Sequence, residues 1–441
     1  MNGSAPEKTG IERFLHHNRL RMKCDNCGLE SENQAFFKTE REPFSRWRTL
    51  CISCQRAKET KVLRVVFLIP IVLGLIGLLL ALLLPDSRAA TPIINFMIIG
   101  VGVIAIAFMH ELGHVFVGKL AGFRIFALEI GVGQLALEFK LFGMRWRLRK
   151  VPLGGRVFGL PSDTHGFRLK QTFFVLGGPM VNAILFLLAW KFRSADASLS
   201  GLEPMRLLMI MNGAVLISSL VPHRTSSPEG RIPNDALNIW LAWKMTPQTI
   251  ASLKSTYYCF EAEECRRERP VAEAMMWLEK GLREVPGNHA LTFSRATYLV
   301  FENRLQEARQ ALLGLRDTLA NDKAFFPLLL NNIAYVDALL DSPELLDEAD
   351  DYSQQALNIA PWVVYFKGTR GLVLVQLGRF NDGIPFLKEA LRDHPEKWGK
   401  AINACCLGIA AQKQGSLDES RSYFALARKL DPRCPLLDRC P

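Results

Sequence analysis

The sequence lacks an apolar segment near its start, since no apolar run begins before residue 63. We therefore expect no signal peptide. It also lacks the regular cysteine spacing of a disulfide framework. Four of its 10 cysteines form two CxxC pairs, and the others are scattered after residue 246. This usage excludes a small disulfide-stabilised secreted domain and favours a reducing, cytosolic setting with one metal cluster.

Apolar residues are concentrated between residues 63 and 222, whereas both ends are polar. The 441 residues exceed one ordinary domain. We expect a cytoplasmic module at 1–60, a membrane domain at 61–245 and a helical repeat domain at 246–441. Lysine and arginine outnumber aspartate and glutamate by 54 to 43. In a membrane protein this excess reflects topology and contact with anionic lipid, so nucleic-acid binding is not expected.

Four segments are long and apolar enough to cross a bilayer, which takes roughly 20 residues each. They are 65–84, 93–117, 172–190 and 205–221. Basic residues crowd the segment before the first span and the long loop between the second and third spans. The positive-inside rule then predicts that both termini lie in the cytoplasm. The predicted fold class is mainly α, a multi-pass bundle of four spans.

The long middle loop has the pattern of a small β-sheet. Apolar and polar residues alternate through 123–158 around a turn at Gly143, which is typical of a hairpin. The glycines Gly154 and Gly155 interrupt its second half. We expect a sheet at the membrane face, with an edge strand that pairs with an extended substrate. A purely structural sheet covering the site fits the pattern equally well.

The second span ends in His110-Glu111-Leu-Gly-His114. Two histidines at i and i+4 lie on one helical face and can bind one metal ion, and Glu111 can handle protons. Such residues at the end of a lipid-length helix are costly and usually mark function. A hydrolytic zinc needs three protein ligands and one open position, so a third ligand must come from elsewhere.

Three residues after the fourth span are candidates for the third ligand: His223, Glu229 and Asp235. A carboxylate ligand would complete a set of two histidines and one acid. Asp235 also precedes an apolar-periodic helix, where it would serve equally well as an N-cap. The residues alone leave both roles open.

The third span is interrupted by Gly177-Gly178-Pro179, with Asn182 one turn further on. Glycine pairs in membrane helices usually permit close helix packing. Pro179 frees backbone carbonyls and Asn182 needs a polar partner in lipid, so the lining of a cavity is the functional alternative.

These landmarks together resemble the site-2 protease family of intramembrane zinc metalloproteases. The resemblance covers roughly residues 93–245 and rests on motifs in the family's order. They are Phe108-Met-His-Glu-Leu-Gly-His114, Ile130-Gly-Val-Gly133, Val151-Pro-Leu-Gly-Gly155, Gly177-Gly-Pro-Met-Val-Asn182, Leu220-Val-Pro222 and Asn234-Asp235.

The resemblance implies that Asp235 is the third zinc ligand and that Asn182 lines the cleft, where it hydrogen-bonds substrate or the developing oxyanion. Gly178, Pro179, Gly154 and Gly155 are the other cleft residues that it indicates. The chain departs from the family in three ways. Ser219-Leu-Val-Pro222 stands where the family usually has Asn-Leu-Leu-Pro, and Ala236 stands where it has Gly. The spacing from Pro222 to Asp235 is also longer than in the shortest family versions.

The N-terminal module carries Cys24-Asp-Asn-Cys27 and Cys51-Ile-Ser-Cys54. Two such knuckles can close one tetrahedral zinc site. Four cysteine ligands leave no position for water, so Cys24, Cys27, Cys51 and Cys54 predict a structural zinc in a ribbon-like module.

The C-terminal part carries a repeat of about 34 residues. Three helix ends share the pattern of an alanine followed by a proline five residues later, and 280–286 is an earlier copy. These ends are Ala356–Pro361, Ala390–Pro395 and Ala427–Pro432. The pattern resembles tetratricopeptide repeats, helix pairs that stack into a solenoid with a surface for a protein or peptide. A plain helical domain is the alternative.

The sequence therefore favours an intramembrane zinc endopeptidase acting on a transmembrane or juxtamembrane segment of a membrane protein. The alternative is a catalytically dispensable membrane scaffold that binds proteins through its repeats. The departures at Ser219 and Ala236 favour the scaffold slightly, whereas the intact Glu111 argues against it.

Overall fold

The computed structural model describes residues 90–193, 204–227, 230–322, 325–394 and 396–439, with short pieces before residue 90. The chain divides into two compact units, Ile52–Phe260 and Met1–Cys51 with Glu261–Pro441. Each unit is described by itself below.

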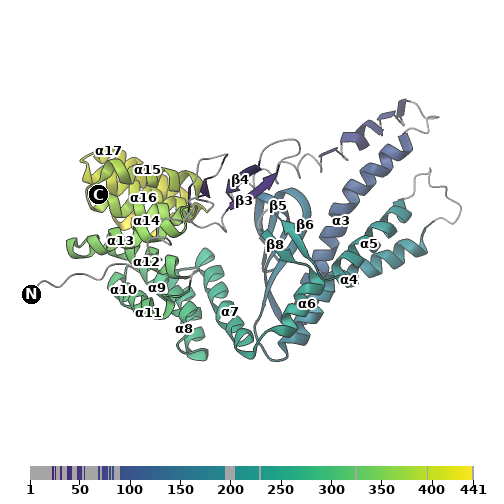
Figure 1. Ribbon diagram of the computed structural model, residues 1–441, viewed down its shortest axis with the longest axis horizontal. Coiled ribbons are helices and arrows are strands. Elements are labelled where there is room, and N and C mark those ends of the chain that lie inside the picture. Colours follow the sequence, from purple (N-terminus) through teal and green to yellow (C-terminus); the bar gives the residue numbers. More distant parts are fainter. Residues whose placement is uncertain are drawn as a thin grey trace, which may run out of the picture. The chain divides into compact units, whose positions relative to one another are not determined.

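Three apolar helices form the frame of the first unit: α3 (Ala90–Leu120), α4 (Phe167–Lys191) and α5 (Pro204–Leu220). All three pack against one another (Figure 1). Among the described residues, Ile93–Leu120 and Phe167–Lys191 are long and apolar enough to cross a membrane, and Pro204–Leu220 is a shorter apolar helix. The structure therefore supplies two of the four predicted spans at full length.

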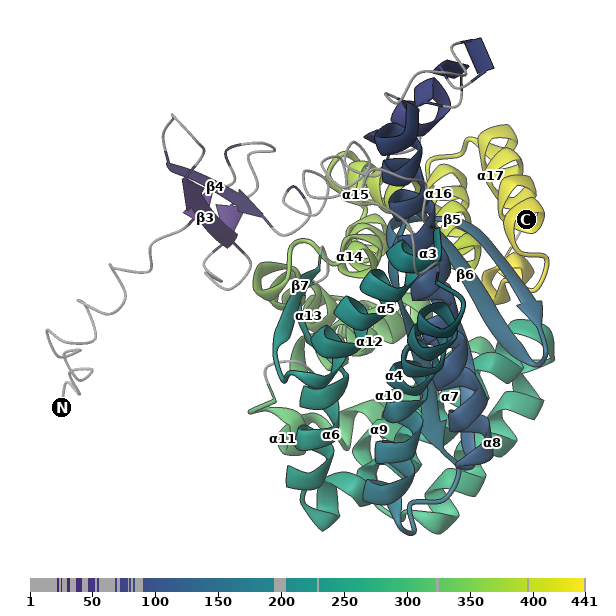
Figure 2. The same ribbon diagram turned by 90° about the vertical axis from the view of Figure 1, so that its right-hand side faces the viewer.

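The predicted hairpin is present as two long strands, β5 (Phe123–Leu141) and β6 (Met144–Pro161), with Gly143 in the turn (Figure 2). Its register is more complex than a simple hairpin. Residues 123–130 pair with residues 155–161 in the antiparallel direction. Residues 127–130 also pair with residues 145–148, and these two segments run parallel to each other. The first half of β5 thus lies between the two halves of β6. Gly131 and Gly133 have positive φ at the bend between the halves of β5, which favours glycine there.

The sheet, α3, α4 and α6 (Asp235–Lys244) enclose one apolar core. Leu128 is fully buried in it, and Phe174 of α4 stacks on Phe123 with ring centroids 4.7 Å apart. A short hairpin, β7 (Arg224–Ser227) with β8 (Gly230–Pro233), leads into α6. This core fixes the end of α3 that carries the histidines.

Helix α7 (Pro247–Glu268) follows, and the boundary between the two units falls within it. The C-terminal part of the second unit then consists of consecutive helices (Figure 1), followed by a short 3-10 helix, η2. They are α8 (Val271–Glu284), α9 (His289–Phe301), α10 (Leu305–Leu313), α11 (Arg316–Leu319), α12 (Phe325–Leu340), α13 (Pro343–Ile359), α14 (Val364–Gln376), α15 (Phe380–Asp393), α16 (Lys397–Lys413), α17 (Leu417–Leu430) and η2 (Pro435–Arg439).

Helices α9/α10, α12/α13, α14/α15 and α16/α17 form packed pairs. The turn inside each pair contains one residue with positive φ, namely Asn303, Asp341, Gly378 or Gly415. The predicted helix ends are also present, because α13, α15 and α17 stop at Ile359, Asp393 and Leu430. The second unit is therefore an α-solenoid of helix pairs.

The N-terminal segment is described only in part. It contains β1 (Met22–Lys23) paired with β2 (Glu30–Ser31), and β3 (Phe37–Arg41) paired with β4 (Trp47–Cys51). Cys24 and Cys27 lie outside the described residues, so the predicted zinc ribbon stays a prediction.

Candidate metal centre

Helix α3 presents His110 and His114 on one face, one turn apart, as the i, i+4 spacing predicts. Both histidines and the intervening Glu111 are buried, with 7–8% of each residue exposed. The two Nε2 atoms lie 3.1 Å apart. The imidazoles therefore aim at one point.

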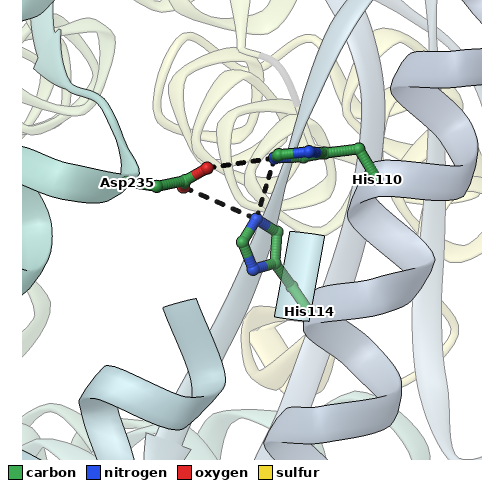
Figure 3. Close-up of side chains that lie close together, drawn as sticks. All are labelled: His110, His114 and Asp235. Carbon is green, nitrogen blue, oxygen red and sulfur yellow. Dashed lines mark hydrogen bonds and ion pairs between the residues drawn. The ribbon is translucent and has the colours of Figure 1, made fainter. Parts of the chain in front are cut away.

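The third member of the group is Asp235, the first residue of α6 (Figure 3). Its Oδ2 lies 3.1 Å from His110 Nε2, and its Oδ1 lies 3.5 Å from His114 Nε2. One ligand atom from each of the three residues falls within 4.8 Å of the others. Figure 3 shows the carboxylate reaching this point from the side opposite α3.

Asn234, not Asp235, caps α6. Its Oδ1 accepts a hydrogen bond from the Leu237 amide at 3.1 Å. Its Nδ2 donates to the carbonyls of Ser218 and Val221, both at 2.8 Å. The end of α5 is thus joined to the start of α6, and the Asp235 carboxylate is left free of capping.

Of the other two candidates for the third ligand, only His223 lies in the part of the chain that the structure describes, and it is not in this group. His223 is exposed, and its Nδ1 lies 2.8 Å from the Val221 carbonyl oxygen. Glu229 lies outside the described residues.

Two hydrogen bonds orient the imidazole rings from behind. His114 Nδ1 lies 3.0 Å from the carbonyl oxygen of Phe174, which can only accept, and 3.3 Å from the amide of Gly178, which can only donate. The shorter contact, with Phe174, favours a proton on Nδ1. His110 Nδ1 lies 2.5 Å from Oδ1 of Asn182. Asn182 is fully buried, and its Nδ2 donates to Asn212 Oδ1 at 3.0 Å. Both polar ends of the Asn182 side chain therefore have protein partners, and its predicted contact with substrate stays a prediction.

The glycines of α4 let this helix approach the histidines. A Cβ at Gly178 would lie 2.5 Å from Nε2 of both His110 and His114. A Cβ at Gly177 would lie 2.4 Å from the carbonyl oxygen of Gly113. The two glycines therefore allow both the close packing of α4 against α3 and the short distance from α4 to the histidines. Pro179, the next residue of α4, is also buried.

The sheet approaches Glu111 through Gly155. A Cβ there would lie 2.6 Å from Glu111 Cγ and 2.9 Å from the Glu129 carbonyl oxygen. Gly154 has φ +69° and open space beside it. Gly155 thus permits the approach and Gly154 the bend that precedes it.

The group fits a zinc ion. Two imidazoles and one carboxylate are a common ligand set for zinc in hydrolases. Zinc–nitrogen distances of roughly 2.0–2.1 Å in a tetrahedron require ligand atoms about 3.3 Å apart. The two Nε2 atoms are 3.1 Å apart, and they lie 3.1 and 3.5 Å from the two different oxygens of Asp235, on either side of that value.

The family assignment agrees with this geometry. The sequence profile described as peptidase family M50 matches residues 96–342, more than half of the chain. The chain therefore belongs to peptidase family M50, and the resemblance to site-2 proteases is confirmed.

Individual relatives share only part of the chain. A protein named "Putative zinc metalloprotease" from Helicobacter pylori (strain ATCC 700392 / 26695) is 27% identical over 99 residues, 19% of this chain and 28% of the relative. One of similar name from Rhizobium meliloti (strain 1021) is 29% identical over 175 residues, 36% of this chain and 44% of the relative. The chain thus spans less than half the length of these relatives.

Two solved structures match the C-terminal helices weakly. A thermophilic TPR protein of Thermus thermophilus, TTC0263, covers 42% of this chain and 95% of its own at 18% identity, with a TM-score of 0.34. MamA covers 39% and 95% at 17% identity, with a TM-score of 0.26. The repeat character of the second unit therefore rests on its own helix pairs.

Sequence reasoning missed two residues that hold the site together, Asn212 and the capping Asn234. Each is an asparagine beside or within an apolar helix, a position where an amide needs a partner. Asn182 and Asn212 both show this signal, because each is an asparagine within an otherwise apolar helix.

Proposed function

We propose that this protein is a membrane-embedded zinc endopeptidase that hydrolyses a peptide bond in a transmembrane or juxtamembrane segment of a membrane protein. The observation that carries the proposal is the convergence of His110, His114 and Asp235 at the buried end of an apolar helix. Membership of peptidase family M50 supports the same activity.

In this proposal His110, His114 and Asp235 hold the catalytic zinc. The ion would supply Lewis-acid activation of the scissile carbonyl and of a water molecule. Glu111 acts as the general base and then the general acid. It takes a proton from the attacking water as the carbon–oxygen bond forms, and returns it to the leaving nitrogen as the carbon–nitrogen bond breaks.

The sheet holds the substrate extended beside Glu111. Residues 155–161 pair with β5 along one edge, and the other edge has no strand partner among the described residues. A substrate strand added at that edge would pass Gly155 and Gly154, next to the base. Gly178 and Pro179 border the site from α4. An extended substrate is required because the peptide bonds of a helix are shielded from attack.

The membrane arrangement completes the proposal. Four spans with both termini in the cytoplasm place the site towards the cytoplasmic face. Lys119 in the last turn of α3 and the basic residues Arg145, Arg147 and Arg149 of β6 support this orientation.

The two soluble ends recruit or gate substrate. A structural zinc held by Cys24, Cys27, Cys51 and Cys54 stabilises the N-terminal module. The repeats bind a protein or peptide, and a cavity of about 430 Å3 in the second unit supports this role. Its wall combines Tyr335, Trp398, Asn331 and Asn403, a mixture of aromatic and amide groups suited to a polypeptide segment.

The test is a comparison of membrane fragments in cells that express wild-type protein or Glu111→Gln, which keeps all three metal ligands. We expect the variant to accumulate an uncleaved membrane protein whose shortened form is present with the wild type. The matched control is His223→Ala, which should cleave like the wild type. Identical fragments with the wild type and Glu111→Gln would contradict the protease proposal and favour the scaffold.

A further inference from the structure

A chain of buried amides connects α5 to the metal centre. The Nδ2 of Asn212 donates to the carbonyl oxygen of Leu208 at 2.8 Å, and the Oδ1 of Asn212 accepts from Asn182 Nδ2 at 3.0 Å. The Oδ1 of Asn182 then faces His110 Nδ1 at 2.5 Å. Three side chains from three helices are therefore linked in one line.

The direction of every hydrogen bond in this line is fixed by its first member. A backbone carbonyl can only accept, so Asn212 must turn its NH2 group towards Leu208 and its oxygen towards Asn182. Asn182 must then turn its own NH2 group towards Asn212 and its oxygen towards His110. An amide oxygen can only accept, so the proton of neutral His110 lies on Nδ1 and the lone pair lies on Nε2.

That tautomer is the one that the metal centre requires. His110 Nε2 faces His114 and Asp235, so it must carry a lone pair to bind a metal ion. His114 is oriented by the backbone of α4, through the carbonyl of Phe174 at 3.0 Å and the amide of Gly178 at 3.3 Å. His110 instead takes its orientation from two side chains, Asn182 and Asn212.

We propose that Asn212 is a positioning residue for the metal centre, which sets the tautomer of His110 through Asn182. The inference rests on the proposed function for the identity of the metal, whereas the line of hydrogen bonds from Leu208 to His110 Nδ1 is read from the geometry alone. Asn182 is fully buried and Asn212 is 2% exposed, so solvent has little room to replace a lost partner. Removing the Asn212 oxygen leaves Asn182 Nδ2 without an acceptor. Asn182 can then flip its amide, which places an NH2 group against His110 Nδ1 and moves the histidine proton to Nε2.

The direct test is nitrogen-15 NMR of histidine side chains in the metal-free, detergent-solubilised full-length protein. Long-range couplings distinguish a proton on Nδ1 from one on Nε2. The His110 signals are assigned by their loss in His110→Gln. We expect Nδ1 of His110 to carry a proton in the wild type, whether or not Nε2 carries a second one opposite Asp235, and to lose that proton in a fraction of Asn212→Leu molecules. A wild-type His110 whose Nδ1 carries no proton overturns the inference even if the variant fails to fold.

The second readout is zinc affinity, measured by competition with a chelator. We expect Asn212→Leu to bind zinc roughly 10- to 100-fold more weakly, the usual loss when a partner behind a metal ligand is removed. Ser218→Ala is the matched control, because it removes an exposed polar side chain from the same helix outside the line of amides. Its zinc affinity should equal that of the wild type.

The outcomes separate this inference from the proposed function. If the wild type binds no zinc at the His110 site, the proposed function fails, while the NMR experiment still decides the role of Asn212. If the wild type binds zinc and Asn212→Leu binds it equally tightly with an unchanged His110 tautomer, the role of Asn212 is refuted and the protease proposal stands.

Discussion

The backbone of Gly155 lies directly against the side chain of Glu111, so closely that a Cβ at residue 155 would stand 2.6 Å from Glu111 Cγ. Glu111 is buried between α3 and this strand. The φ of Gly155 does not lie in the left-handed region, so the backbone conformation alone does not require glycine here. The close contact with the Glu111 side chain is the reason that residue 155 has no side chain.

Gly155→Ala should abolish cleavage without loss of zinc. The added methyl group must displace Glu111 or the strand, because its three nearest atoms belong to Glu111 and Glu129 and none of them to a metal ligand. The measurement is cleavage of a membrane substrate together with zinc content by mass spectrometry. Val157→Ala, which changes a half-buried residue of the same strand, should retain activity. Wild-type cleavage by Gly155→Ala would exclude the close contact.

Gly178→Ala should lose the catalytic zinc itself. Its Cβ would lie 2.5 Å from both Nε2 atoms, in the space that a bound ion and its ligands need. We expect about one zinc ion per chain fewer than in the wild type. Met180→Ala is the control, because Met180 lies two residues further along the same helix and is half exposed. An unchanged zinc content in Gly178→Ala would mean that α4 does not approach the histidines this closely.

Much of the site was predictable from the sequence because its first part is local. The helical period alone brings His110 and His114 to one face. The residues alone allow Asp235 to be either the third metal ligand or the N-cap of α6, and the family resemblance indicates the ligand. In the structure Asn234 is the N-cap. Asn212 could not be paired with Asn182 or His110 in advance. No sequence periodicity relates residues on three different helices, and only packing brings them together.

The fold, like the site, could be predicted where it depends on local sequence and not where it depends on packing between distant segments. Helix ends in the repeats follow from local turn chemistry, and Gly378 and Gly415, which lie in turns inside two of the helix pairs, have the positive φ that favours glycine. The hairpin at 123–161 follows from alternation, but its parallel pairing between 127–130 and 145–148 does not. The alternation of apolar and polar residues predicts which face of the sheet a residue occupies, but it does not predict which strand lies beside it.

A buried ion pair holds two helix pairs of the repeats together, and its loss should be more harmful at pH 7 than at pH 4. Arg309 Nε lies 2.6 Å from Oδ1 of the fully buried Asp337, and Arg309 Nη2 lies 2.8 Å from Glu348. Burial raises the pKa of Asp337 above its usual value, and Arg309 opposes that rise. Arg309→Met removes the opposition, so the pKa rises further. A pKa of Asp337 that is higher in the folded state than in the unfolded state lowers the free energy of unfolding at any pH where the unfolded Asp337 is ionised, which is above about pH 4.

Hydrogen exchange across α12 and α13 measures this effect. We expect Arg309→Met to lower the local unfolding free energy by about 3–5 kcal/mol at neutral pH, and by clearly less at pH 4. Arg304→Met is the control, because the ion pair of Arg304 with Glu307 is exposed and screened by solvent, so its loss should change the local stability little. Equal losses at both pH values would rule out an ionised Asp337 as the cause.

The thiol of Cys406 should resist alkylation in the folded protein. Burial raises its pKa to about 12, so the reactive thiolate is scarce at pH 8. Iodoacetamide labelling followed by peptide mass spectrometry should leave Cys406 unmodified until denaturant is added. Rapid labelling of Cys406 in the native protein would show that α16 is not packed as described.

The most direct test of the central claim is the zinc content of Asp235→Ala compared with His223→Ala, each purified as the full chain in detergent. The proposed ligand set predicts that Asp235→Ala contains about one zinc ion per chain fewer than the wild type, and that His223→Ala contains the same amount as the wild type. Unchanged zinc in Asp235→Ala, or loss of zinc in His223→Ala, would contradict the assignment of His110, His114 and Asp235 as the metal centre.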